Sequence, residues 1–319
     1  MNRHHRQLFA SSARFVCLVL LLAMFMAPPS RGVPQSAATT GTSVSVLQAR
    51  AEQGDARAQY QLGKILLAHS GSPADVANGV KWIRAAAAQN YANAQFVLGY
   101  LYERGQGVAR NYALALQNYQ AAAVQQHSTA QNNLASMYQR GLGVPKNPGK
   151  ALEWYLAAAR QGDSVAQCNL ASLYYLGSGT TRDYGQSLRW FRSAAETGMP
   201  EAQSNLAFFY FHGIGVQRDY TEAARLVRLA AEQGLSIAQS GLGYLYETGK
   251  GVPLDYVNAY SWYSRAIAGG DTNSADRRKE LARIMTRDQL RQANTIASAS
   301  VPYPGAQPAS TGVFSLLSH

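Results

Sequence analysis

The residues best suited to chemistry in this chain do not form a recognisable catalytic set. A glycine-rich G-x-G loop binds phosphate where it follows a strand, but here it follows a predicted helix and recurs five times. His69, His127 and His212 occupy unrelated positions, which does not predict a metal site. No H-E-x-x-H or G-x-S-x-G motif occurs. The sequence therefore predicts a protein without catalysis, metal or cofactor, and a nucleophilic Cys168 is the minor alternative.

Aromatic residues recur where they would share one face of successive helices. Side chains separated by four and then three residues lie on one helical face. Aromatic side chains are enriched where proteins recognise partners, so this face predicts partner binding. Packing of single rings between neighbouring helices is the alternative of equal weight. The predicted partner-binding rings are Phe96, Tyr100, Tyr175, Phe208, Phe211 and Tyr244.

Asparagine recurs at a second position, as Asn133, Asn169 and Asn205. A primary amide offers both donors and an acceptor. A row of amides spaced by one structural unit would pair with the backbone of an extended peptide, whatever its side chains. A hydrogen bond within a helix or between neighbouring units is the alternative.

A third repeated position is basic, and its members each precede a predicted helix cap: Arg110, Lys146, Arg182 and Arg218. They predict a stripe that meets an anionic partner surface or an envelope polymer by charge attraction. A solvated loop edge is the favoured alternative. Nucleic acid is a poor candidate because basic and aromatic residues are not interleaved on one motif.

A period of 36 residues positions all of these side chains. Six units run without a gap from Asp55 to Gly270, each with Ala-Gln near its start and one shared leucine position. Such a period indicates a repeat architecture. The glycines that mark it most clearly are Gly105, Gly141, Gly177, Gly213 and Gly249.

Each unit predicts two helices joined by the glycine turn. In one unit, Glu201 to His212 has apolar residues at helical spacing, and the following glycine suits a left-handed helix end. Asp219 with Glu222 predicts a capping box for the second helix. Small residues in the first helix, such as Gly99 and Gly243, would let the second helix approach. Residues assigned to the same cap position are Asp75, Asn111, Asn147, Asp183 and Asp255.

The unit from Ala202 to Gly234 resembles the Sel1-like repeat. The similarity lies in the Ala…Leu-Gly/Ala…Tyr pattern, the G-x-G-V turn, the acidic or Asn cap, the aromatic pair and Ala-Ala-x-x-Gly. The resemblance implies an all-α solenoid of about six helix-turn-helix repeats, similar to tetratricopeptide arrays, whose first helices line a concave face. It also implies an adaptor that holds other proteins. Exported relatives that bind β-lactams carry a cysteine pair in nearly every repeat, which this chain lacks.

The ends of the chain differ from the repeats. A basic start and an apolar run from Phe15 to Ala27 predict a signal peptide over residues 1–37 and hence a periplasmic or secreted protein; an uncleaved anchor is the alternative. We predict a linker over residues 38–44 and a half-repeat cap over 45–54. The six repeats cover residues 55–270, two capping helices cover 271–298, and a loose tail covers 299–319. Export would leave Cys168 as one thiol, either buried or in an intermolecular disulfide.

Composition limits the remaining classes. The 319 residues are 47% hydrophobic, carry a formal charge of +11 and include two cysteines. These values exclude a disulfide-dense scaffold, a Cys-based zinc module and a polytopic membrane protein. The resemblance, together with the aromatic face and the basic and apolar start, implies a protein-binding adaptor or regulatory scaffold of the envelope or exterior. The alternatives are a polysaccharide- or peptidoglycan-binding module and, less favoured, a β-lactam-binding hydrolase.

Overall fold

The structure is a computed structural model that describes residues 44–68 and 72–299. Over these residues the chain forms fifteen helices and no strand. The predicted all-α solenoid of two-helix repeats is confirmed. The predicted signal peptide, the tail beyond residue 299 and His69 lie outside the described residues.

The chain divides into two compact units, separated between Arg182 and Asp183. The N-terminal unit, described over residues 44–68 and 72–182, holds one single helix, three repeats and the first helix of the fourth. Its helices are α2 (Val44–Glu52), α3 (Ala56–Ala68), α4 (Pro73–Ala88), α5 (Ala92–Arg104), α6 (Tyr112–Ala123), α7 (Ser128–Arg140), α8 (Pro148–Arg160) and α9 (Ser164–Leu176).

The C-terminal unit is described over residues 183–299. It holds the second helix of the fourth repeat, two complete repeats and two further helices. Its helices are α10 (Tyr184–Glu196), α11 (Pro200–His212), α12 (Tyr220–Glu232), α13 (Ser236–Thr248), α14 (Tyr256–Ala268), α15 (Ser274–Ile284) and α16 (Arg287–Ser298).

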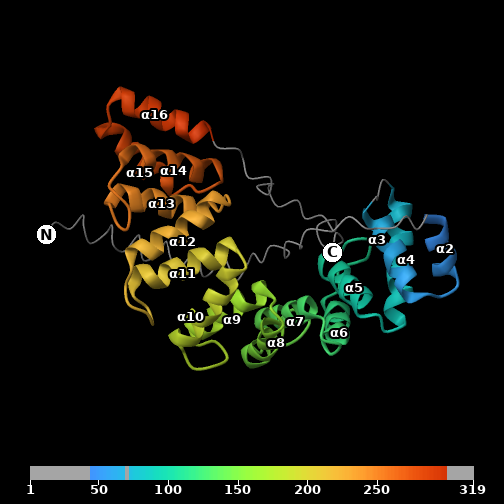
Figure 1. Cartoon of the computed structure of the whole chain (residues 1–319). Helices are drawn as coiled ribbons and strands as arrows, with labels where there is room; N and C mark the ends of the chain where they lie inside the picture. The colour runs from blue at the N-terminus through green and yellow to red at the C-terminus, as the bar shows by residue number, and fades with distance from the viewer. Residues whose placement is uncertain (1–43, 69–71, 300–319) are drawn as a thin grey trace. The chain divides into compact units, whose positions relative to one another are not determined.

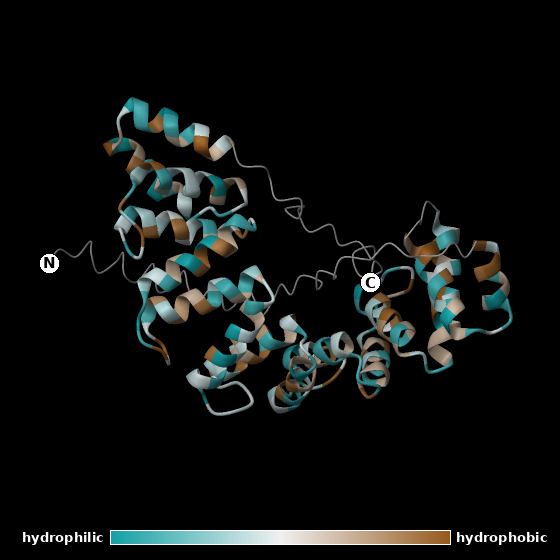
Figure 2. Cartoon of the chain, in the orientation of Figure 1, coloured by the Kyte–Doolittle hydropathy of each residue, from teal (hydrophilic) through white to brown (hydrophobic). Residues whose placement is uncertain are grey.

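Within each unit, helices that follow one another in the chain pack side by side, as from α10 to α14 (Figure 1). Hydrophilic and hydrophobic residues are interspersed along the helices (Figure 2). The buried residues include the repeated leucines and the Ala-Ala pairs that sequence periodicity indicates. In the C-terminal unit both α15 and α16 pack on α14. No helix in the described part of the chain is long and apolar enough to cross a membrane.

The predicted caps of the second helices are confirmed at five of six positions, but the predicted capping box of Asp219 and Glu222 is only half formed, because the Glu222 carboxylate pairs with Arg225. Gly105, Gly141, Gly177, Gly213 and Gly249 end the first helices in the left-handed conformation. Asn111, Asn147, Asp183, Asp219 and Asp255 accept backbone hydrogen bonds at the starts of the second helices. The capping box of Thr286 and Gln289 is present.

Asp75 was wrongly assigned as a cap. Ser72 is the N-cap of α4, and its hydroxyl accepts from the Asp75 backbone N–H. Ser72 also donates to the Asp75 carboxylate at 2.8 Å. The first repeat departs from the 36-residue spacing at this point because Pro73, which suits the first helical position, starts the helix three residues earlier.

Small residues bring the two helices of a repeat together, as predicted. A Cβ placed on Gly99 would lie 2.8 Å from the Tyr119 ring, and one placed on Gly243 would lie 2.8 Å from the Tyr263 ring. Separations below 3 Å are not found for real Cβ atoms. The first helix is therefore in direct backbone contact with a large ring of the second.

Candidate functional site

Three of the predicted aromatic residues meet in the C-terminal unit. Phe208 and Phe211 come from α11, and Tyr244 from the equivalent face of α13. The Phe211 and Tyr244 ring centroids are 6.2 Å apart, and Tyr220 at the start of α12 lies 5.1 Å from Phe211. The rings are all half-buried rather than sealed. We call Phe208, Phe211, Tyr220 and Tyr244, together with His212 and Lys250, the aromatic cluster.

Lys250 occupies the centre of the aromatic cluster. Its ammonium nitrogen lies 5.2 Å from the Phe211 centroid, 5.7 Å from that of Tyr220 and 5.4 Å from that of Tyr244. It also donates a hydrogen bond to the Tyr244 hydroxyl at 3.2 Å. No carboxylate of the described residues pairs with it. Cation–π attraction therefore holds three rings around one uncompensated charge.

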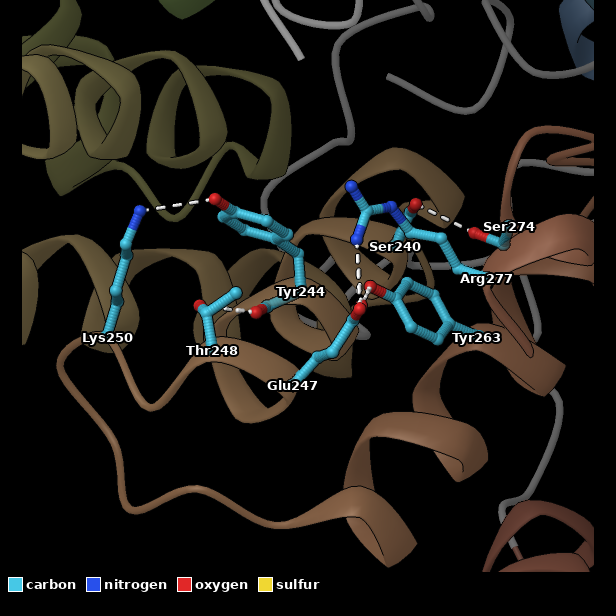
Figure 3. Close-up of polar contacts among 8 residues, drawn as sticks. All are labelled: Ser240, Tyr244, Glu247, Thr248, Lys250, Tyr263, Ser274 and Arg277. Atoms are coloured by element: carbon cyan, nitrogen blue, oxygen red, sulfur yellow. Dashed lines mark hydrogen bonds and ion pairs between the residues drawn. The ribbon is translucent and has the colours of Figure 1, made fainter. Parts of the chain in front are cut away.

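A second set of contacts fixes Tyr244 from the opposite side (Figure 3). The Arg277 guanidinium lies 5.1 Å from the Tyr244 ring centroid. Arg277 in turn donates to both carboxylate oxygens of Glu247, at 2.9 and 3.1 Å. Glu247 also accepts from the Tyr263 hydroxyl at 2.5 Å. Because Arg277 comes from α15, the helix after the last repeat orients the ring.

His212 is the exposed member of the aromatic cluster. Its ring lies 4.4 Å from that of Phe208 and 5.0 Å from that of Phe211. Partial burial, followed by the nearby Lys250 charge, lowers the pKa of His212 below its ordinary value. The lowered pKa favours the neutral imidazole, whereas Lys250 brings a positive charge to the cluster.

The predicted rings of the N-terminal unit lie in more varied surroundings. Phe96 is buried and stacks on His127, the N-cap of α7, with centroids 4.7 Å apart, so its ring is closed to a partner. Tyr100 is half-buried and lies beneath the Arg104 guanidinium at 5.6 Å. Tyr175 is half-buried. Tyr100 and Tyr175 are thus the accessible rings here among the predicted residues.

The asparagine row is mostly inaccessible. Asn169 and Asn205 are buried, and Asn133 is half-buried. Asn169 donates to Asn132 of the preceding repeat at 3.1 Å. This hydrogen bond joins two repeats, which is the alternative to peptide binding that the sequence also allows.

The four predicted basic residues are all exposed: Arg110, Lys146, Arg182 and Arg218. Arg110 and Arg218 each lie over the tyrosine two residues later, with the guanidinium 5.6 and 5.4 Å from the ring centroid. The two arginine side chains therefore lie at the starts of the second helices, as their place just before the caps indicates.

Two repeated hydrogen bonds have a signal in the sequence that no single helix shows by itself. The first is a pairing rule between positions sixteen residues apart. Buried Tyr119, Tyr155 and Tyr263 of the second helices donate to Glu103, Gln139 and Glu247 of the first helices, at 2.7, 2.9 and 2.5 Å. Where the second helix lacks a phenol, as at Phe191 and Val227, the first helix carries Tyr175 and Phe211 instead. In these two repeats an aromatic residue therefore takes the position that pairs with the phenol in the others.

The second signal is the glutamine of each Ala-Gln pair. The buried Gln131 amide donates to the Ala123 carbonyl at 3.0 Å, which joins it to the preceding repeat. Its oxygen accepts from Gln161 at 2.7 Å. Equivalent bonds to the preceding helix are made by Gln59, Gln95, Gln167 and Gln239. In five of the six repeats the repeated glutamine thus bonds to the helix that precedes the repeat.

The described residues contain no group of three or more His, Cys, Asp or Glu that could hold a metal ion. Cys168 is buried in α9. The His127 imidazole accepts from the Ala130 backbone N–H and caps α7. His127 and Cys168 are therefore part of the local fold.

Six consecutive segments match the family model described as Sel1 repeat, at residues 56–91, 92–127, 128–163, 164–199, 200–235 and 236–271. None of the curated proteins matches the chain. A solved Sel1 repeat protein from Oxalobacter formigenes is 34% identical, over 63% of this chain and 86% of that chain, with a TM-score of 0.58.

Two other solved structures show lower similarity. The protective antigen c5321 of uropathogenic Escherichia coli, with an SLR fold, is 29% identical over 82% of this chain and 72% of that chain, with a TM-score of 0.38. The immunity protein Pa5087 from Pseudomonas aeruginosa is 20% identical over 69% and 87%, with a TM-score of 0.42. The six matched segments coincide with the helix pairs of the structure, and the chain belongs to the Sel1 repeat family.

Proposed function

We propose that this chain is an adaptor that binds a partner protein, or an extended segment of one, through the aromatic cluster of α11 and α13. Sel1 repeats generally serve as protein-interaction scaffolds without catalysis. The basic and then apolar start of the chain supports export, so we place the adaptor in the periplasm or outside the cell.

The half-buried state of the rings carries this proposal. Rings from two successive repeats are held at fixed separations by Lys250 and Arg277 before any partner arrives. Rings that are already ordered lose little conformational entropy on binding. Burial of aromatic surface then supplies the binding energy. The proposal rests on the rings and not on the asparagine row, because Asn169 and Asn205 are buried.

Site-specific photo-crosslinking in the native host tests the proposal. A photoreactive phenylalanine analogue replaces Phe208 or Tyr244 in the full chain, one position at a time. We expect the same partner protein to be crosslinked from both positions, because both rings belong to one surface.

Tyr210 provides the matched control. It lies on α11 as well, but its hydroxyl accepts from Arg192 at 3.1 Å, toward α10. The analogue at position 210 is expected to give little or no crosslink to that partner. Equal crosslinking from positions 208, 244 and 210, or none from 208 and 244, would overturn the proposal.

A further inference from the structure

The caps of the second helices change from neutral to acidic along the chain. Asn111 and Asn147 cap α6 and α8 in the N-terminal unit, whereas Asp183, Asp219 and Asp255 cap the equivalent helices of the C-terminal unit. The cap hydrogen bonds are alike, at 3.0 Å for the amides and 2.9 Å for the carboxylates. The negative charge of Asp would also interact favourably with the helix dipole. Asn and Asp are about equally good N-caps, so capping alone does not decide between a neutral and an acidic residue at these positions.

Exposed cations surround the neutral caps. Arg104 and Arg140 end the first helices of the second and third repeats, and Arg110 and Lys146 precede the caps. Each turn closes on itself, since the Asn111 N–H donates to the Tyr102 carbonyl at 2.9 Å and the Asn147 N–H to that of Tyr138 at 2.8 Å. Each turn thus brings together two cations that are six residues apart.

Consecutive turns lie along one edge of the N-terminal unit. A Cβ placed on Gly143, in the turn of the third repeat, would lie 2.5 Å from the carbonyl oxygen of Tyr112. Tyr112 directly follows the cap Asn111 of the second repeat. The turn that holds Arg140 and Lys146 is therefore packed against the helix start that follows Arg110.

Carboxylates are nearly absent from this edge. Between Arg104 and Gly162 the sequence has one acid, Glu153. No carboxylate of the described residues pairs with Arg104, Arg110, Arg140, Lys146 or Lys150. In the C-terminal unit, by contrast, Arg225 pairs with Glu222 at 2.7 Å, and Arg218 is followed by Asp219. The cations of these turns in the N-terminal unit therefore have no carboxylate partner in the described part of the chain, whereas the equivalent turns of the C-terminal unit each carry an acidic cap.

We propose that this basic turn edge, formed by Arg104, Arg110, Arg140, Lys146 and Lys150, docks an acidic, extended polypeptide segment of a partner protein. Cations repeated from turn to turn match charges distributed along a chain better than one compact anion. Three of them lie over rings, at 5.6, 5.6 and 5.3 Å from the centroids of Tyr100, Tyr112 and Tyr138. The inference rests on the proposed function only in taking the partner to be a protein.

A cap exchange in the full chain tests the inference. Asn111→Asp with Asn147→Asp keeps both caps, since Asp serves at the other repeats, but places two negative charges on the edge. The probe is a labelled twenty-residue poly-glutamate peptide, followed by fluorescence anisotropy over a salt series. Wild type is expected to bind it in a salt-dependent manner, and the double variant to bind roughly tenfold more weakly. Circular dichroism and Tm are expected to be retained.

Gln217→Glu with Gln292→Glu is the matched control, because it adds the same charge at exposed positions of the C-terminal unit. Its affinity is expected to stay within about twofold of wild type. An equal loss in this control, or no binding of poly-glutamate by wild type, would overturn the inference. So would cap-dependent binding to phosphatidylglycerol vesicles without binding to poly-glutamate.

The two proposals fail separately. Crosslinking from positions 208 and 244 does not depend on the caps of the N-terminal unit. If poly-glutamate does not bind while crosslinking persists, the basic turn edge is rejected and the adaptor proposal remains. If crosslinking fails while poly-glutamate binding depends on the caps, the aromatic cluster is rejected and the basic turn edge remains.

Discussion

Replacement of Gly143 by alanine is expected to destabilise the N-terminal unit by about 3 kcal/mol. Gly143 has a φ of +68°, and its added Cβ would lie 2.5 Å from the Tyr112 carbonyl oxygen and 2.6 Å from the carbonyl carbon. The left-handed conformation alone costs an alanine about 1 kcal/mol. The rest of the cost arises because backbone, not a flexible side chain, would have to move. Urea denaturation followed by circular dichroism measures the change.

Two other glycines of the same unit separate these causes. Gly162 has a φ of +86° but nothing within 4 Å of an added Cβ, so Gly162→Ala is expected to cost about 1 kcal/mol. Gly149 lies in the first turn of α8 with its nearest neighbour at 3.5 Å, so Gly149→Ala is expected to be neutral or to stabilise by up to about 1 kcal/mol. Equal effects of Gly143→Ala and Gly162→Ala would show that the turns do not pack on the preceding repeat.

Stability is expected to fall steeply above pH 10, and Tyr119→Phe with Tyr155→Phe is expected to remove much of that fall. Burial raises the pKa of both phenols above the ordinary value, and the Glu103 charge adds to the effect at Tyr119. A raised folded-state pKa leaves stability intact below about pH 10 and removes it as the pH rises toward the folded-state value. Each tyrosine contributes about 1.4 kcal/mol per pH unit in that interval.

Because the phenols of the unfolded chain are only half ionised at pH 10, the double variant should lose about 2 kcal/mol less than wild type between pH 10 and 11. It should be less stable at pH 7, by about 1 kcal/mol for each lost hydrogen bond. Ile83→Val, which trims a fully buried residue without removing a phenol, is the control and should keep the full alkaline loss. Parallel pH profiles for wild type and the double variant would contradict the assigned burial of these hydroxyls.

Most of the helix architecture could be predicted from the 36-residue period, because each element has its own local signal. Glycine at position 141 and asparagine at position 147 act on the backbone within a few residues of themselves. The misplacement of Asp75 has the same local origin, since Ser72 and Pro73 provide a stronger helix start three residues earlier.

The burial of the candidate side chains could not be predicted from one unit at a time. Phe96 is covered by His127, which belongs to the end of the same unit but occupies a position that is Asp163, Met199 or Leu235 in later units. Asn169 is buried because its partner Asn132 lies 37 residues away on the neighbouring helix. Which face remains open therefore depends on contacts between repeats, whose residues vary.

The aromatic cluster shows the same limit. The sequence places Phe208, Phe211 and Tyr244 on equivalent helical faces, and the structure brings them together. Nothing local predicts that Lys250, in the turn after α13, reaches back to rings from three helices. Nor does the repeat pattern predict Arg277, which comes from a helix outside the six repeats.

The most direct measurement is the affinity of the crosslinked partner, once purified, for the double variant Phe208→Ala/Tyr244→Ala. Hot-spot aromatic residues contribute at least about 1–2 kcal/mol each, so we expect binding to weaken by about tenfold or more. Tyr210→Ala should bind like wild type, and all variants should keep the wild-type circular dichroism. An unchanged affinity of the double variant would contradict the claim that this cluster is where the adaptor holds its partner.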